Sequence, residues 1–141
     1  MGIRKETMNK DQKRVLIKSQ QGELDAVPMY LRLSEIAKDQ KLKAIFKQLA
    51  AEEGKHAAVF YKLTGEKLKP KMLKARMLPI LQKVLGWKLL IKIISKAEYS
   101  AYKTYEPVVK MFAEVESVRN DEKRHGDILR KYNEDSARRK E

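Results

Sequence analysis

The sequence predicts an all-α protein: a four-helix bundle of two similar helix pairs, with an extra short helix in the connection between the pairs. Two observations predict this class. The 141 residues contain only 6 Gly and 4 Pro among abundant Lys, Glu, Leu and Ala, which is a helix-forming composition. Over long stretches the apolar residues recur every three or four positions, as they do on the buried face of a helix. A chain of this length can bury the core of one domain.

The first two predicted helices form the first pair. Residues 1–9 are expected to be a flexible start, followed by a helix over about Lys10–Lys38. The chain then breaks at the sequence KDQK, where Asp39 is suited to cap a second helix over about Lys41–Leu63. Gly65 is expected to end that helix.

Pro28 is unfavourable inside a continuous first helix, because it has no N–H to donate to the Leu24 carbonyl. Either the helix kinks at Pro28, or it begins there and leaves Glu23 in a loop. We favour the kink, because the freed carbonyl could bind water or a neighbouring side chain.

Residues 64–86 are expected to form the crossover between the pairs. The sequence TGEKLKPKM is a loop, and the following short helix carries Pro79 near its middle and ends at Gly86. This helix makes the crossover longer than a simple turn.

The second pair is expected to begin with a long helix over about Trp87–Tyr105. Pro107 is expected to open the last helix, which reaches about Asn133. The final sequence, EDSARRKE, has the composition of a frayed tail, with residues 136–141 flexible. The bundle domain therefore spans residues 10–135.

The second and last predicted helices carry the same pattern on their apolar faces, in alternating steps of four and three residues. One stripe is Leu42, Phe46, Leu49, Glu53, His56, Phe60 and Leu63. The other is Met111, Val115, Val118, Glu122, His125, Leu129 and Tyr132. Both stripes are apolar except at the same two points, where each has the motif Glu-x-x-His. The spacing predicts that these motifs lie in a bundle core.

The first and fourth predicted helices also match each other. Their stripes are Leu16, Gln20, Glu23, Val27 and Tyr30, and Trp87, Ile91, Ile94, Glu98, Tyr102 and Tyr105. Each has a Glu with a Tyr seven residues later, two turns along the same face. The chain thus repeats Glu-x6-Tyr followed by Glu-x-x-His, which predicts two pseudo-symmetric helix pairs.

Buried carboxylates need compensating charge, and the spacing suggests its source. Residues three apart share a helical face, so a Glu and a His can reach one metal ion. Two divalent cations would balance four carboxylates that are otherwise costly to bury. Oxygen ligands with one imidazole per metal suit Fe or Mn. The alternative is that the Glu–His pairs are solvated surface pairs.

This ligand set, two Glu and two Glu-x-x-His motifs in a helical bundle, resembles the rubrerythrin branch of the ferritin-like superfamily. GELDAVPMY with EEGKH, and KAEYSAYKTYEP with NDEKRH, are similar to its two half-sites. The resemblance covers about residues 10–135 and implies a ferritin-like bundle that binds two Fe ions, with Mn as the alternative. The implied metal ligands are Glu23, Glu53, His56, Glu98, Glu122 and His125. Glu53 and Glu98, or their symmetry mates, would include the bridging carboxylates.

The resemblance also implies supporting residues. Tyr30 and Tyr105 would donate hydrogen bonds to ligand carboxylates, and Glu52 and Asp121 would each hold the second nitrogen of a metal-bound His. The alternatives are that the two Tyr are core aromatics and that the two acids are surface charges.

The chain departs from the family pattern in two respects. Rubrerythrins usually carry a rubredoxin domain with four Cys, and this chain has no Cys. They usually have an extra Glu near the third ligand, whereas Ser95 and Ala101 stand three residues to either side of Glu98 here. Oxidase, ferroxidase, iron-handling and partner-fed peroxidase activities therefore all stay open.

The expected function is redox chemistry with O2 or hydrogen peroxide, with electrons from an external donor protein. Iron storage or delivery is one alternative, and a metal-free basic bundle that binds nucleic acid is another. A homodimer is compatible with the site but not required by it, because one chain holds both half-sites.

The net charge of +13 indicates anionic partners or simple solubility. No phosphate-binding loop or base-reading motif is evident, so nucleic acid is the less favoured partner. The sequence MGIRKETMNK is charged with no apolar segment after it, and no apolar run could span a membrane, so a cytoplasmic protein is expected. The amphipathic residues 73–94 could touch lipid, but Trp87 with KLLIKII is interpreted more simply as core.

Overall fold

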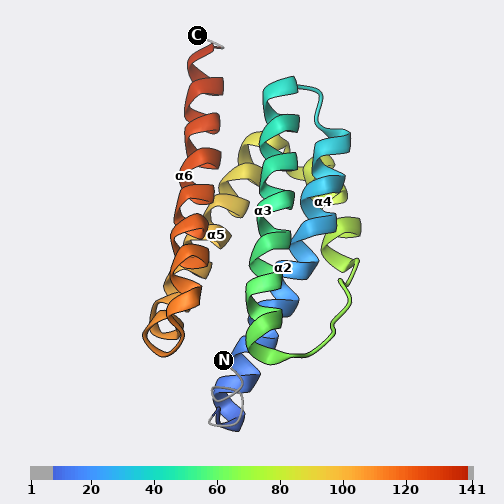
Figure 1. Ribbon diagram of the computed structural model, residues 1–141. Coiled ribbons are helices and arrows are strands. Elements are labelled where there is room, and N and C mark those ends of the chain that lie inside the picture. Colours follow the sequence, from blue (N-terminus) through green and yellow to red (C-terminus); the bar gives the residue numbers. More distant parts are fainter. Residues whose placement is uncertain (1–7, 140–141) are drawn as a thin grey trace. The chain divides into compact units, whose positions relative to one another are not determined.

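The computed structural model describes residues 8–139, and every regular element in that range is helical (Figure 1). The elements are α2 (Lys10–Ile36), α3 (Gln40–Thr64), α4 (Leu73–Leu85), α5 (Trp87–Met111), the 3-10 helix η1 (Ala113–Val115) and α6 (Glu116–Arg139). The predicted all-α class is confirmed. Within the described residues, no helix has both the length and the apolar character needed to cross a membrane.

Helices α2 and α3 pack against each other in a first compact unit, which extends to Leu78. Asn9 caps α2: its side chain accepts from Gln12 N, and the Gln12 side chain accepts from Asn9 N. Asp39 caps α3 as predicted, and Gly65 ends α3 in the left-handed conformation at φ 70°. The flexible start predicted for residues 1–9 falls mainly on residues outside the described range.

Helix α2 continues through Pro28, so the alternative that a helix begins there is wrong and Glu23 lies on the helix. The buried side chains Leu16 and Leu33 lie on either side of Pro28. Burial of these apolar side chains stabilises the helix on both sides of Pro28 and offsets the loss of the hydrogen bond that Pro28 cannot donate.

Helices α5 and α6 pack against each other in a second compact unit, which begins at Pro79. The prediction that Pro107 opens the last helix is wrong, because Pro107 lies inside α5. The following turn is anchored by Val108, which is buried and accepts a hydrogen bond from the Phe112 N–H at 2.8 Å. The chain leaves the helix at Phe112, where φ is −134° and ψ is 97°. Met111 is therefore an exposed residue of α5, not the first member of the α6 stripe.

The tail predicted to fray after Asn133 is helical as far as Arg139. Two features stabilise this extension. Arg130 pairs with Glu134 across one turn at 3.9 Å, and Arg138 and Arg139 place positive charge at the helix C-terminus. Residues 140–141 lie outside the described range.

The predicted stripes are largely buried. Every member of the α3 stripe is buried, and so are the α6 members from Val118 to Tyr132. The exceptions on α2 and α5 are Val27, Trp87 and Tyr102, which are half-buried. Both Glu-x-x-His motifs therefore lie among buried apolar residues, as their spacing predicted.

Candidate metal centre

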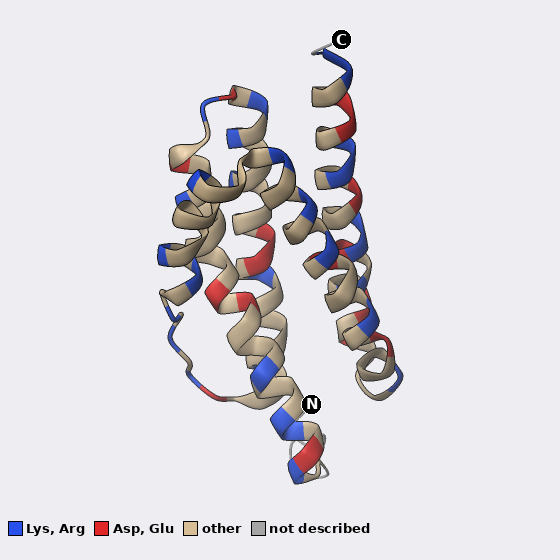
Figure 2. Cartoon of the chain, turned by 180° about the vertical axis from the view of Figure 1, so that it is seen from behind, with Lys and Arg blue, Asp and Glu red and all other residues tan. Residues whose placement is uncertain are grey.

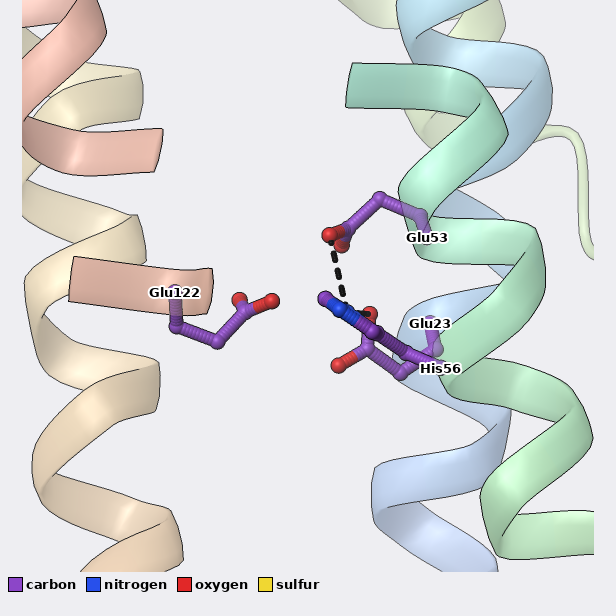
Figure 3. Close-up of side chains that lie close together, drawn as sticks. All are labelled: Glu23, Glu53, His56 and Glu122. Atoms are coloured by element: carbon purple, nitrogen blue, oxygen red, sulfur yellow. Dashed lines mark ion pairs between the residues drawn. The ribbon is translucent and has the colours of Figure 1, made fainter. Parts of the chain in front are cut away.

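The first helix pair brings together Glu23 from α2 with Glu53 and His56 from α3. His56 Nδ1 lies 3.3 Å from Glu53 Oε1 and 3.6 Å from Glu23 Oε2. The three side chains point toward one another (Figure 3), and none of these residues is more than 3% exposed. Each offers a ligand atom within 4.8 Å of the others. We call these residues the first half-site.

The second helix pair repeats this arrangement with Glu98 from α5 and with Glu122 and His125 from α6. His125 Nδ1 lies 3.6 Å from Glu98 Oε2 and 3.8 Å from Glu122 Oε1. All three residues are buried, and His125 is fully enclosed at 0% exposure. Their ligand atoms also lie within 4.8 Å of one another. We call these residues the second half-site.

The spacing of these atoms fits a bound cation. A charge-assisted hydrogen bond between nitrogen and oxygen is usually about 2.7–2.9 Å long, shorter than the four distances above. Ligands at about 2.0–2.2 Å from a metal, at right or tetrahedral angles, stand about 3.0–3.6 Å apart. Three of the four distances, from 3.3 to 3.6 Å, fall in that range, and the fourth, 3.8 Å, is slightly longer. The donor set of two carboxylates and one imidazole in each half-site is one that Fe and Mn accept.

The electrostatics of the first half-site also favour a cation. Burial raises the pKa of Glu23 well above its ordinary value, and the negative charge of Glu53 raises it further. The His56 imidazole acts in the opposite direction, because its hydrogen bond favours the carboxylate form. Without a metal, the half-site can reduce its excess negative charge by keeping a proton on Glu23. A metal ion would supply the same compensation and release that proton.

A polar contact one turn before Glu23 joins α2 to the end of α3. The buried Gln20 accepts a hydrogen bond from Thr64 Oγ1 at 2.5 Å and donates from Nε2 to the Glu66 carbonyl at 2.8 Å. Gln20 was predicted as a stripe position, and its partners are the last residue of α3, Thr64, and Glu66 in the loop that follows. The contact fixes the rotation of α2 against α3, and so directs Glu23 toward His56.

A different contact serves the second half-site, and the sequence did not predict it. Ser95, also one turn before the ligand Glu, donates to the Gly126 carbonyl at 2.9 Å. Tyr99 donates to Asp127 Oδ1 at 2.5 Å. The ring of Tyr99 lies so close to Gly126 that a Cβ there would be 2.7 Å from Tyr99 Cε1. The available sequence signal was Gly126 itself, a helix-interior glycine directly after His125.

The predicted supporting residues have mixed surroundings. Tyr30 is 1% exposed and its ring stacks on Phe46 with centroids 5.9 Å apart, while Tyr105 is buried on α5. Glu52 accepts a hydrogen bond from Gln48 at 2.9 Å, and Asp121 pairs with Arg124 at 3.0 Å. The burial of both Tyr fits a role beside the half-sites and a core role equally, so their predicted hydrogen bonds stay predictions.

These features define an all-helical protein with two buried carboxylate–histidine clusters, one on each helix pair. Over residues 14–133, the chain matches the protein-family model described as Rubrerythrin, and it belongs to that family. This match confirms the predicted resemblance and the ferritin-like fold class. No curated protein and no solved structure matched the chain.

Proposed function

We propose that this protein is a di-iron carboxylate protein that carries out redox chemistry with O2 or hydrogen peroxide. Membership of the Rubrerythrin family supports the class of chemistry. The observation that carries the proposal is the repetition of one buried half-site, two Glu and one His, on both helix pairs. A structural role alone gives no reason to bury four carboxylates and two imidazoles at equivalent positions, since apolar residues would stabilise the core more.

Each half-site would hold one iron ion. In the first, Glu23, Glu53 and His56 Nδ1 supply the ligand atoms, and in the second, Glu98, Glu122 and His125 Nδ1 do so. Two divalent ions balance the four carboxylates when both His are neutral. When bound, the iron ions supply electrons to O2 or peroxide, and an external donor protein replaces those electrons. Mn is the alternative metal.

The protein's own contribution is geometric and electrostatic. The low exposure of the ligands keeps water from competing for the metal and strengthens the attraction between carboxylate and cation. Gln20 and Ser95 hold the helices of each pair in register, so the ligands need little rearrangement on binding. The Glu23 carboxyl takes up a proton when the site lacks metal and releases it when metal binds.

Metal content and single-turnover kinetics test the proposal together. Protein loaded with Fe(II) without oxygen should contain about two iron ions per chain by elemental analysis. In stopped-flow mixing with O2 or H2O2, the bound iron should be oxidised faster than free Fe(II). The reaction should stop after one turnover and resume only when a reductant is added. Glu98→Ala should abolish the rapid phase. Tyr30→Phe, which keeps the stacked ring, should reduce it far less.

Two results would overturn the proposal. An iron content well below one ion per chain would mean that the proposed metal site does not exist. Oxidation of Glu98→Ala at the wild-type rate would mean that the site has no redox role. Many irons per chain without rapid two-iron oxidation would indicate iron storage instead.

A further inference from the structure

Helix α4 presents an apolar face to solvent. Its opposite side includes the buried Ala75. The exposed side is large and aliphatic: Leu73 is 66% exposed, Met77 47%, Ile80 64% and Val84 75%. These four residues recur at steps of four, three and four, so they line one side of the helix. We call them the α4 stripe.

Positive charges border the α4 stripe on both sides. At about 100° per residue, Lys74 lies to one side of the stripe, and Arg76 and Lys83 lie to the other. All three side chains belong to exposed residues. An apolar stripe with cations along both edges is the pattern of a helix that lies in the plane of a membrane surface.

The charge around α4 is of one sign. Residues 67–97 contain nine Lys and Arg and no Asp or Glu. Figure 2 shows the blue residues along the loop that leads into α4 and along α4 itself. Within the described part of the chain, no carboxylate forms an ion pair with these nine side chains. The positive charge of this segment is therefore not neutralised by ion pairs with the described carboxylates.

The loop before α4 is fixed on α2. Gln21 Nε2 donates to the Lys69 carbonyl at 2.8 Å, and the Lys71 N–H donates to Asp25 Oδ1 at 2.7 Å. Gln20 holds the Glu66 carbonyl in the same way. These hydrogen bonds hold the loop on the first helix pair as far as Lys71, two residues before α4 begins.

We propose that α4 docks on the surface of an anionic lipid bilayer, with the α4 stripe inserted among the acyl chains and the bordering cations at the headgroups. The helix has 13 residues, so it extends about 20 Å along the surface. That is too short to span the bilayer and long enough for interfacial binding. Near an anionic surface, each cation raises the partition coefficient by about fivefold. This inference does not depend on the proposed redox activity.

Two other partners fit less well. A second copy of the chain would bring a segment with the same uncompensated positive charge against this one, and like charges repel. Nucleic acid would satisfy the cations, but it would leave the four aliphatic side chains of the α4 stripe in water. An anionic bilayer is the partner that matches both the charge and the apolar surface.

Vesicle binding of the full chain tests the proposal. Trp87, the chain's only Trp, begins α5 two residues after α4 ends and is half-buried, so its fluorescence reports on this region. The protein should co-sediment with vesicles of phosphatidylcholine and phosphatidylglycerol in equal parts, and not with phosphatidylcholine alone. Binding should weaken with added salt. Ile80→Ser with Val84→Ser should lower the partition coefficient at least tenfold.

Matched variants separate the stripe from general surface effects. Val15→Ser with Leu31→Ser removes two aliphatic side chains of α2 that are 40% and 44% exposed, and it should bind like wild type. Lys74→Gln with Lys83→Gln should weaken binding, whereas Lys18→Gln with Lys55→Gln should weaken it less. Thermal melts of all variants should match, since every altered residue is exposed.

Three results would overturn the proposal. One is no binding to anionic vesicles, and another is equal loss of binding in the α2 control. The third is a dimer in solution that Ile80→Ser with Val84→Ser dissociates, because the α4 stripe would then be covered by a second copy.

Discussion

Gly54 and Gly126 are both interior helix glycines beside a predicted metal ligand, and we expect the same substitution to act on them in opposite directions. Gly54 follows Glu53 and is exposed, and an added Cβ would meet its nearest neighbour, Val27 Cγ2, at an ordinary 3.9 Å. Gly126 follows His125 and is buried under Tyr99. Gly54→Ala should stabilise the protein, and Gly126→Ala should destabilise it.

The magnitudes follow from the local packing. Replacing Gly by Ala in a helix interior stabilises by about 1 kcal/mol, which is the whole effect expected at Gly54. At Gly126, the new Cβ would lie 2.7, 2.8 and 2.9 Å from three ring carbons of Tyr99, against an optimum of about 3.5–4.0 Å. Overpacking of this kind costs about 1–3 kcal/mol. Moving the ring away also strains the hydrogen bond from Tyr99 to Asp127, worth about 1 kcal/mol at this partly exposed position.

Adding these contributions predicts a net destabilisation of about 1–3 kcal/mol for Gly126→Ala. The two variants should therefore differ by roughly 2–4 kcal/mol in free energy of unfolding. Urea denaturation of metal-free protein, followed by circular dichroism at one pH, measures this difference. Tyr99→Ala provides the decisive background, because it removes the ring that the new methyl group meets.

In the Tyr99→Ala background, Gly126→Ala should become stabilising, like Gly54→Ala in the wild type. The reasoning is refuted if Gly126→Ala is as stable as wild type, or if it stays equally destabilising after the Tyr99 ring is removed. Either outcome would mean that the close contact between α5 and α6 does not determine the need for glycine at this position.

The remaining predictions concern charge and backbone conformation. The raised pKa of Glu23 means that folding favours the protonated carboxyl group in metal-free protein. This contribution to the free energy of unfolding is fully present below about pH 4.3, the ordinary pKa of Glu. It is lost as the pH rises through the raised pKa. Thermal melts should therefore show wild type losing stability relative to Glu23→Gln between acid and neutral pH, and an unchanged difference would contradict the burial argument. Fe(II) or Mn(II) at a hundred times the dissociation constant of wild type should stabilise wild type by about 2.7 kcal/mol for each occupied half-site at pH 7. The same metal concentration should stabilise Glu23→Gln by less in total, measured in the same melts. Gly65→Ala should destabilise by about 1 kcal/mol, because φ is 70° there, while Gly22→Ala, with no atom within 4 Å of its new Cβ, should stabilise. Equal urea midpoints for these two variants would be evidence against the left-handed cap.

The repeated pattern made the helix pairs and the half-sites predictable from sequence. Two stripes with the same steps require the same buried face, and a Glu and a His three residues apart on such a face must point into the core. This reasoning placed Glu53 with His56, and Glu122 with His125, within reach of each other. The grouping of each motif with Glu23 or Glu98 came from the resemblance to the rubrerythrin branch, and it agrees with the rule that consecutive helices pack side by side.

The errors occurred where local signals competed with tertiary packing. Pro107 has the properties of a helix-opening residue, yet burial of Val108 and Phe112 extends α5 by another turn. Tyr99 has no distinguishing spacing, because its partners Gly126 and Asp127 are on another helix and become neighbours only when α5 packs on α6. A periodic pattern identifies which face is buried, but it does not identify the side chains that meet across the interface.

The two half-sites share their ligands but not their supports, and this difference has a physical consequence. Gln20 and Ser95 occupy equivalent positions, each three residues before the Glu of its half-site. Gln20 reaches the chain at the end of α3, whereas Ser95 bonds to the Gly126 carbonyl, directly beside His125. A change in the spacing of α5 and α6 therefore displaces His125 directly. The hydrogen bond of Gln20 lies two turns from His56, so a similar change there acts on the first half-site less directly. The second half-site should accordingly be the more sensitive of the two to packing substitutions, even though both present the same donor atoms.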